Sequence, residues 1–106
     1  MTFDSYQEWT RTTAIYPKHQ ALAYLTSGLA EEAGEVAGKF KKSIRDNWTV
    51  DYFEEQVVAE LGDVLWYLAR YADELGYSLQ DVAELNVHKL KSRQERSVLQ
   101  GSGDAR

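Results

Sequence analysis

The chain has 106 residues, which fits one compact domain, and it contains no cysteine, so it offers no disulfide framework, thiol nucleophile or thiolate metal site. Its formal net charge of −5 argues against non-specific binding to nucleic acid, which requires a basic face. No N-terminal apolar run resembles a signal peptide and no stretch approaches the ~20 apolar residues of a membrane span, so we expect a cytoplasmic protein with no membrane partner.

Four segments show the three- and four-residue spacing of apolar residues that is typical of α-helices, and none shows the alternation of a strand. The predicted helices span residues 3–14, 18–45, 51–75 and 78–96. Pro17 separates the first two, because proline cannot continue a helix without losing a backbone hydrogen bond. The pattern predicts an all-α fold.

The ends of the third and fourth segments carry local signals. Gly76 is expected just past the end of the third helix, and Ser78 followed by Asp81 predicts a capping box for the fourth. The end of the chain is rich in glycine and serine and lacks apolar anchors. We therefore predict one helical domain at residues 1–97 and a disordered tail at residues 98–106.

The second and third predicted helices each carry a pair of acids at i, i+3. Glu32 and Glu35 on one helix, and Glu60 and Asp63 on the other, are displaced in the same direction from the apolar face of their own helix. If the two helices pack antiparallel, four carboxylates converge and repel one another unless a cation lies between them. Mg²⁺ prefers oxygen ligands and keeps waters that a phosphate can displace. Periodicity alone leaves two interpretations open, a metal site and a solvated acidic surface.

Three stretches in this order resemble the signature of the MazG-type nucleotide pyrophosphohydrolases. They read LAEEAGEVA at residues 29–37, AELGDVLWY at 59–67 and NVHKLKSR at 86–93, similar to E-x-x-E, then E-x-x-D, then N-x-x-K-L-x-x-R. A spacer of 24 residues separates the two acidic motifs, and the resemblance covers about residues 20 to 96. Each acidic motif is weak alone, whereas the ordered set is specific.

The resemblance implies a bundle of four to five helices that forms a homodimer or a dimer of dimers, with a base pocket completed by both subunits. It implies hydrolysis of an NTP or dNTP between the α- and β-phosphates to a monophosphate and pyrophosphate. The acids at Glu32, Glu35, Glu60 and Asp63 would then bind Mg²⁺, with Mn²⁺ as a substitute. A carboxylate near the metal-bound water would act as general base. Glu31, Glu32 and Glu35 are all candidates, and the sequence does not choose among them.

Six residues are candidates for substrate contacts: Lys39, Lys42, Tyr67, Asn86, Lys89 and Arg93. Asn86 lies within the apolar stripe of its helix, so it either hydrogen-bonds another helix or contacts sugar or phosphate. The four cations would face the phosphates, although most such side chains are simply solvated. Tyr67 lies on the side of its helix that carries Glu60 and is expected to stack on a base, whereas Trp66 is expected at a dimer interface.

Two alternatives remain open. A dUTP- or dCTP-directed enzyme, or a phosphoribosyl-ATP pyrophosphohydrolase, would share the acids and differ in the base pocket. A non-catalytic helical module that binds a partner protein would carry the acids as a solvated face, and it would show no thermal shift with Mg²⁺.

Overall fold

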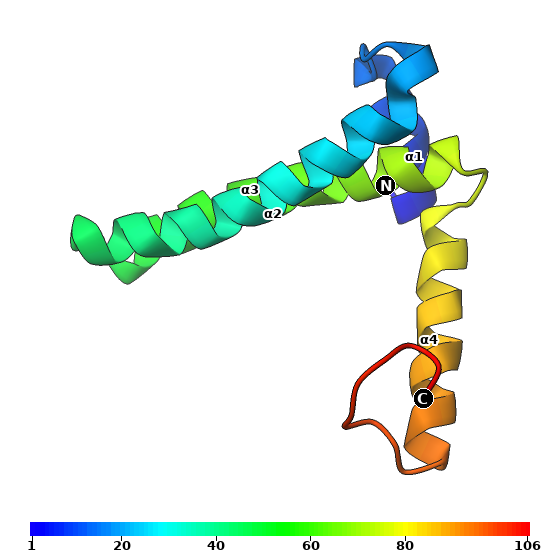
Figure 1. Cartoon of the computed structure of the whole chain (residues 1–106). Helices are drawn as coiled ribbons and strands as arrows, with labels where there is room; N and C mark the ends of the chain where they lie inside the picture. Colours follow the sequence, from blue (N-terminus) through cyan, green and yellow to red (C-terminus); the bar gives the residue numbers. More distant parts are fainter.

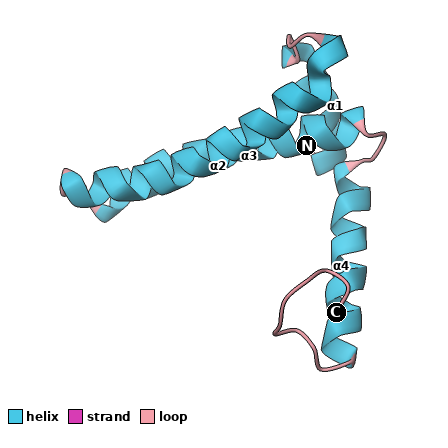
Figure 2. Ribbon diagram, in the orientation of Figure 1, coloured by secondary structure: helices cyan, strands magenta, loops and turns pink.

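The computed structural model describes all 106 residues and contains helices but no strands, which confirms the predicted all-α fold (Figures 1 and 2). The elements in chain order are α1 (Phe3–Thr10), η1 (Arg11–Thr13), η2 (Lys18–Gln20), α2 (Ala21–Arg45), α3 (Val50–Glu74) and α4 (Leu79–Glu95). They match the four segments predicted from apolar spacing, except that α3 begins one residue before the predicted start at residue 51. None of the helices has the unbroken apolar length that a membrane span needs.

The two longest helices, α2 and α3, form an antiparallel hairpin that dominates the molecule (Figure 1). The turn between them contains Asn47 in the left-handed region (φ 52°), and the Thr49 side chain caps α3 by accepting a hydrogen bond from the Tyr52 amide. Leu25 is fully buried at the N-terminal part of α2, in a small core with Tyr16 and Ala21. The hairpin therefore has a packed end near α1 and a free tip at the turn.

The packed end is held by a charged network that we call the clasp, formed by Arg11, Tyr16, Arg70, Asp73 and Glu74. Arg11 and Arg70 both bind Asp73, at 2.9 and 2.6 Å, and Arg70 also reaches Glu74 at 3.3 Å. The Tyr16 hydroxyl donates to Glu74. The hydrogen bonds from Arg11 and then Arg70 lower the pKa of Asp73 to about 2. Because the Arg70 side chain is only 5% exposed, its charge depends on these two carboxylates.

Buried Gln7 joins α1 to both neighbouring helices. Its amide donates to the carbonyls of Ala69 and Tyr77 at 3.2 and 2.9 Å, and its carbonyl accepts from the Leu79 amide at 3.0 Å. The path from α3 into α4 turns at Gly76, whose positive φ of 85° suits glycine. These contacts fix where α4 begins.

Helix α4 begins with the predicted capping box, since Ser78 and Asp81 exchange hydrogen bonds between side chain and backbone. It packs against α1 and the end of α3 and then runs away from the hairpin (Figure 1). Residues 98–106, for which the sequence predicts disorder, loop back beside α4. There the Arg93 side chain donates to the carbonyl of Asp104 at 2.8 Å.

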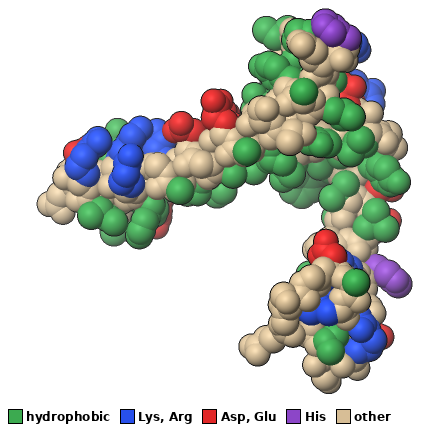
Figure 3. Space-filling view, viewed as in Figure 1, with side chains coloured by type: hydrophobic (Ala, Val, Ile, Leu, Met, Phe, Trp, Pro, Cys, Tyr) green, Lys and Arg blue, Asp and Glu red, His purple; other side chains and the backbone are tan.

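Much apolar surface stays uncovered in the single chain. Only 10 of 106 residues are buried, and the accessible surface is 7771 Å², whereas a compact monomer of 12.1 kDa exposes about 6,000 Å². Exposed apolar side chains continue along the faces predicted as core: Leu22, Phe40, Ile44, Leu61, Leu68, Val82 and Leu90. Green patches on the hairpin and at its junction with α4 show this in Figure 3. Two helices cannot cover these faces alone, so they remain available to a partner.

Candidate functional site

Three predicted metal ligands meet between α2 and α3. Carboxylate oxygens of Glu32, Glu60 and Asp63 all lie within 4.8 Å of one another, and we call these residues the acidic cluster. The geometry follows from the sequence, because the i, i+3 spacing places Glu60 and Asp63 one turn apart on α3, opposite Glu32 on α2. Glu32 and Glu60 are half-buried, and Asp63 is exposed.

The electrostatics of the acidic cluster are unfavourable in the protein alone. Burial, and then the charges of Asp63 and Glu60, raise the pKa of Glu32. The nearest counter-charge is Lys39, whose Nζ lies 3.5 Å from Glu60 and also donates to Gln56 at 3.4 Å. One lysine cannot neutralise three carboxylates. Oxygen ligands from two helices, partly open to solvent, fit a hard divalent cation.

The other two candidate acids lie outside the acidic cluster but next to it on α2. Glu35 is exposed one turn further along the helix. Glu31, which precedes Glu32, is exposed as well. It lines a cavity that extends from the cluster toward the start of α2, away from Glu35. Both carboxylates are therefore available to act on a group held at the cluster.

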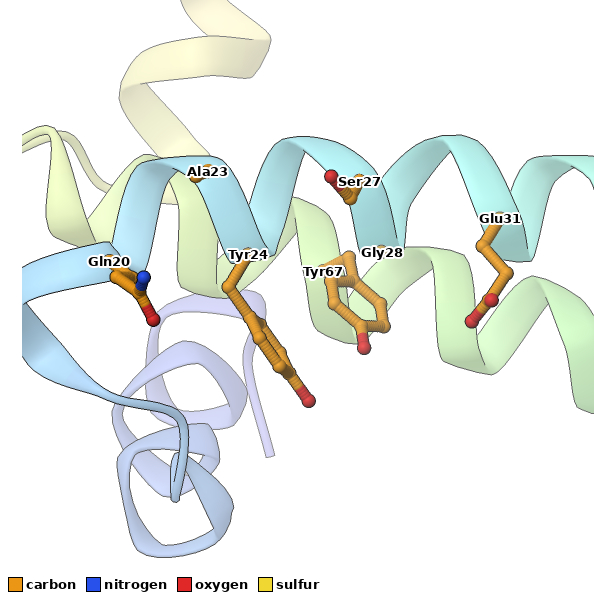
Figure 4. A pocket seen from close by; sticks show the side chains of 7 residues that line it. All are labelled: Gln20, Ala23, Tyr24, Ser27, Gly28, Glu31 and Tyr67. Atoms are coloured by element: carbon orange, nitrogen blue, oxygen red, sulfur yellow. The ribbon is translucent and has the colours of Figure 1, made fainter.

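The cavity beside the cluster has a volume of about 420 Å³. Its lining residues are Gln20, Ala23, Tyr24, Ser27, Gly28, Glu31 and Tyr67. Tyr24 and Tyr67 project in the same direction from α2 and α3, with Gln20 toward one end and Glu31 toward the other (Figure 4). The two rings are stacked with centroids 6.5 Å apart, and burial followed by the neighbouring Tyr24 raises the pKa of Tyr67 to about 12. Aromatic walls with a few polar groups suit a planar base.

The predicted substrate-binding residues fall into two groups. Lys39 and Lys42 on α2 follow Glu35 toward the tip of the hairpin, where basic side chains cluster beside acidic ones (Figure 3). Asn86, Lys89 and Arg93 lie on α4, which runs away from the acidic cluster within the chain (Figure 1). The chain alone brings together the acids, Lys39 and Tyr67, but not the three residues of α4.

The three α4 residues have their own surroundings. Asn86 is exposed and, with Lys89, lines an apolar hollow between α3 and α4. Lys89 and Arg93 both contact the Asp104 carboxylate, at 3.3 Å each. Arg93 is buried against the returning tail, and its Nε has no hydrogen-bond partner. The Asp104 carboxylate thus binds Lys89 and Arg93, two of the cations that are predicted from the sequence to contact phosphate.

Trp66, expected at a dimer interface, has its partners within the chain. Its indole N–H donates to the Thr13 hydroxyl at 2.7 Å, and its ring packs on the edges of Tyr16 and Tyr67. The segment that follows α1 covers this side of α3, a contact between residues more than 50 positions apart. Helical periodicity does not reveal it.

Sequence reasoning missed Gln20, Tyr24 and Ser27 as lining residues of the cavity. A signal for two of them exists, because Tyr24 and Ser27 lie one to two turns before Glu31 on the same helix. Gln20 belongs to η2, a short turn whose position depends on tertiary contacts, so no spacing rule points to it.

Comparison with known proteins agrees with this geometry. A model of the MazG nucleotide pyrophosphohydrolase domain matches residues 20–98, which include α2, α3 and α4. The Gene 37 protein of Mycobacterium phage L5 is 46% identical over 114 aligned positions that cover all of both chains. No solved structure matches. The chain belongs to the MazG nucleotide pyrophosphohydrolase domain family.

Proposed function

We propose that this protein is a Mg²⁺-dependent hydrolase that cleaves an NTP or dNTP between the α- and β-phosphates to give a nucleoside monophosphate and pyrophosphate. The observation that carries this proposal is the acidic cluster next to an aromatic-walled cavity that Glu31, the neighbour of Glu32, lines, within the matched domain. One half of the site suits metal-bound phosphates and the other half suits a base. A solvated acidic face has no need of a neighbouring aromatic cavity.

Glu32, Glu60 and Asp63 would hold the metal, with Glu35 one turn away as a further ligand. A divalent cation bound there would lower the pKa of a coordinated water and neutralise phosphate charge. Mn²⁺, which also accepts oxygen ligands, is expected to substitute. Lys39 now contacts Glu60, and bound metal would free its ammonium group to contact a phosphate oxygen. Lys42, one turn further along α2, would extend that positive surface.

Glu31 is our choice for the general base. Its carboxylate lies outside the acidic cluster and borders the cavity, so it is free to accept a proton from the attacking water. Glu35 is the competing choice. Glu31→Gln should lower kcat while the affinity for Mg²⁺ is retained, whereas loss of a metal ligand lowers both. Calorimetric titration with Mg²⁺, alongside steady-state kinetics of Glu31→Gln and Glu35→Gln, separates the two roles.

Completion of the site would require a second copy of the chain. Asn86, Lys89 and Arg93 are remote from the acids of their own chain, and exposed apolar surface continues from the hairpin onto α4. In a homodimer, or a dimer of dimers, α4 of one subunit would lie over the acidic cluster of the other. Its Lys89 would then leave Asp104 and face the phosphates.

Subunit complementation tests this arrangement. Glu60→Gln and Lys89→Ala are each expected to lose activity, but a mixed dimer has one site that takes Glu60 from one chain and Lys89 from the other. Random mixing should restore about a quarter of the wild-type activity. No recovery after verified subunit exchange would contradict a shared site.

The reaction is tested by pyrophosphate release from a panel of NTPs, dNTPs and phosphoribosyl-ATP, with and without Mg²⁺. Release that requires Mg²⁺ and falls at least about a hundredfold in folded Glu60→Gln supports the proposal. The same panel separates a broad NTP hydrolase from a dUTP- or dCTP-directed enzyme and from a phosphoribosyl-ATP hydrolase. No release from any nucleotide would favour a non-catalytic interaction module.

A further inference from the structure

Gly28 is the one glycine of the hairpin whose missing side chain matters to a neighbour. A Cβ at this position would overlap Cε1 and Cζ of Tyr67 and lie 2.8 Å from its Cδ1. Ordinary carbon–carbon contacts are about 3.5–4.0 Å. At Gly34, Gly38 and Gly62 an added Cβ would meet nothing within 4 Å. The Tyr67 ring from α3 therefore lies directly on the backbone of α2, in space that any other residue at position 28 would fill.

The ring has little freedom to move elsewhere. Trp66 packs edge-on against it with centroids 4.9 Å apart, and Tyr24 is stacked on it with centroids 6.5 Å apart. Tyr24 is itself stacked on Tyr16, which the clasp holds through Glu74. An atom inserted beneath Tyr67 would push the ring outward into the cavity that Tyr24, Ser27 and Glu31 line (Figure 4).

We infer that Gly28 is a positioning residue for Tyr67, and that its missing Cβ sets the width of the cavity that Tyr24, Tyr67 and Glu31 line beside the acidic cluster. The inference deepens the proposed function and rests on it for the identity of the occupant, the nucleoside part of the substrate. Gly28 touches no reacting group. It acts through the ring, so it determines how well the nucleoside is held while the metal ligands stay unchanged.

The placement of the ring is tested without any substrate. In the wild type, NMR should give nuclear Overhauser contacts between the Gly28 Hα protons and the Tyr67 ring, assigned with Tyr67→Phe. In Gly28→Ala the Tyr67 ring resonances should move, whereas in Gly38→Ala, the same change in the same helix, they should stay. Absence of the wild-type contact would overturn the inference whatever the enzyme does.

Kinetics test the consequence of that placement. Gly28→Ala should raise KM for the preferred nucleotide about tenfold or more, with a smaller effect on kcat, because the nucleoside is displaced before the metal-bound phosphates are. The Kd for Mg²⁺ alone should be unchanged. An equal fall of kcat at constant KM, or a loss of Mg²⁺ affinity, would contradict a role confined to the cavity.

A rescue series shows whether the effect passes through Tyr67. Leucine at position 67 lacks the two overlapping atoms Cε1 and Cζ, whereas phenylalanine keeps both. Leucine keeps only Cδ1, which would lie 2.8 Å from the added Cβ, so adding Gly28→Ala to Tyr67→Leu should cost much less in KM and melting temperature than in the wild type. Adding it to Tyr67→Phe should cost as much as in the wild type. This holds even if Gly28→Ala alone fails to fold, since the double variant with leucine should fold. Equal costs in both backgrounds would overturn the inference.

The outcomes separate this inference from the proposed function. If the wild type hydrolyses no nucleotide but the NMR contact and the leucine rescue of stability are found, the packing role stands and the assigned occupant is wrong. If hydrolysis is found and Gly28→Ala behaves as Gly38→Ala does, the proposed function stands and the positioning role is wrong.

Discussion

At the packed end of the hairpin, both arginines of the clasp contact carboxylates, whereas midway along the same two helices three carboxylates face one another beside a single lysine. The clasp lowers the pKa of Asp73, and the acidic cluster raises the pKa of Glu32. The pKa values of these two carboxylates shift in opposite directions because Asp73 has its positive partners within the chain, whereas Glu32 faces other carboxylates. The acidic cluster has one lysine for three carboxylates, so it leaves negative charge that a bound cation can balance.

Among the changes considered, removal of Arg70 from the clasp should have the largest effect on stability. Arg70→Met leaves Asp73 and Glu74 without their buried partner, so we expect unfolding to become easier by about 3 kcal/mol. Urea unfolding at fixed protein concentration measures it. Arg45→Met is the matched control, because Arg45 is 61% exposed and pairs only with Asp46, and it should change stability by less than about 0.5 kcal/mol. Similar losses in both variants would contradict a stabilising role specific to the clasp.

A charge on the exposed face of α4 should affect assembly. Leu85 is 60% exposed and lines the apolar hollow with Val82 and Tyr77. Leu85→Glu should raise the dissociation constant of the proposed dimer at least about tenfold, because a buried leucine contributes about 1.5–3 kcal/mol. Sedimentation velocity over a range of concentrations measures the shift, and Gln94→Glu adds the same charge elsewhere on α4 as a control. A monomeric wild type would contradict the proposed assembly.

The clasp also predicts how stability responds to acid. The folded-state pKa of Asp73 is depressed to about 2 from the ordinary 3.8, so its contribution is fully present above pH 4 and lost as the pH falls toward 2. We expect a loss on the order of 1–2 kcal/mol over this window, measured as the stability difference between wild type and Asp73→Asn. A difference that stays constant from pH 5 to pH 2 would disagree with the clasp geometry.

The smallest expected effect has the opposite sign. Glu32→Gln removes a carboxylate that is partly buried beside Glu60 and Asp63, so in chelator-treated protein it should raise the free energy of unfolding by about 0.5 kcal/mol. Thermal unfolding in EDTA is a sufficient measurement. Destabilisation of the metal-free protein by this substitution would mean that the cluster is not strained by repulsion.

The helices and the acidic cluster could be predicted because both depend on local spacing. The capping box at Ser78 and the turn at Gly76 are short-range hydrogen-bond patterns, and both are found. To predict that the i, i+3 acids of the two helices meet, it is enough to assume that α2 and α3 pack antiparallel. Three of the four predicted ligands meet, and Glu35 lies one turn away.

The features that the sequence did not predict depend on contacts between distant parts of the chain. Arg11 and Asp73 pair across 62 positions, and Trp66 and Thr13 across 53, so no periodicity links them. The start of α4 is held by buried Gln7, a polar residue that an apolar pattern does not select. These long-range contacts explain why the clasp, the cavity lined by Tyr24 and the separation of α4 from the acids were not foreseen.

The most direct test of the account is the stabilisation of the protein by Mg²⁺. The melting temperature of the wild type should rise steadily with Mg²⁺, corresponding to about 2.7 kcal/mol when the free ion reaches a hundred times its Kd. In Glu32→Gln, which begins slightly more stable, the rise should be much smaller at the same concentrations. Equal rises in the two proteins, or none in the wild type, would contradict the assignment of the acidic cluster as the metal site.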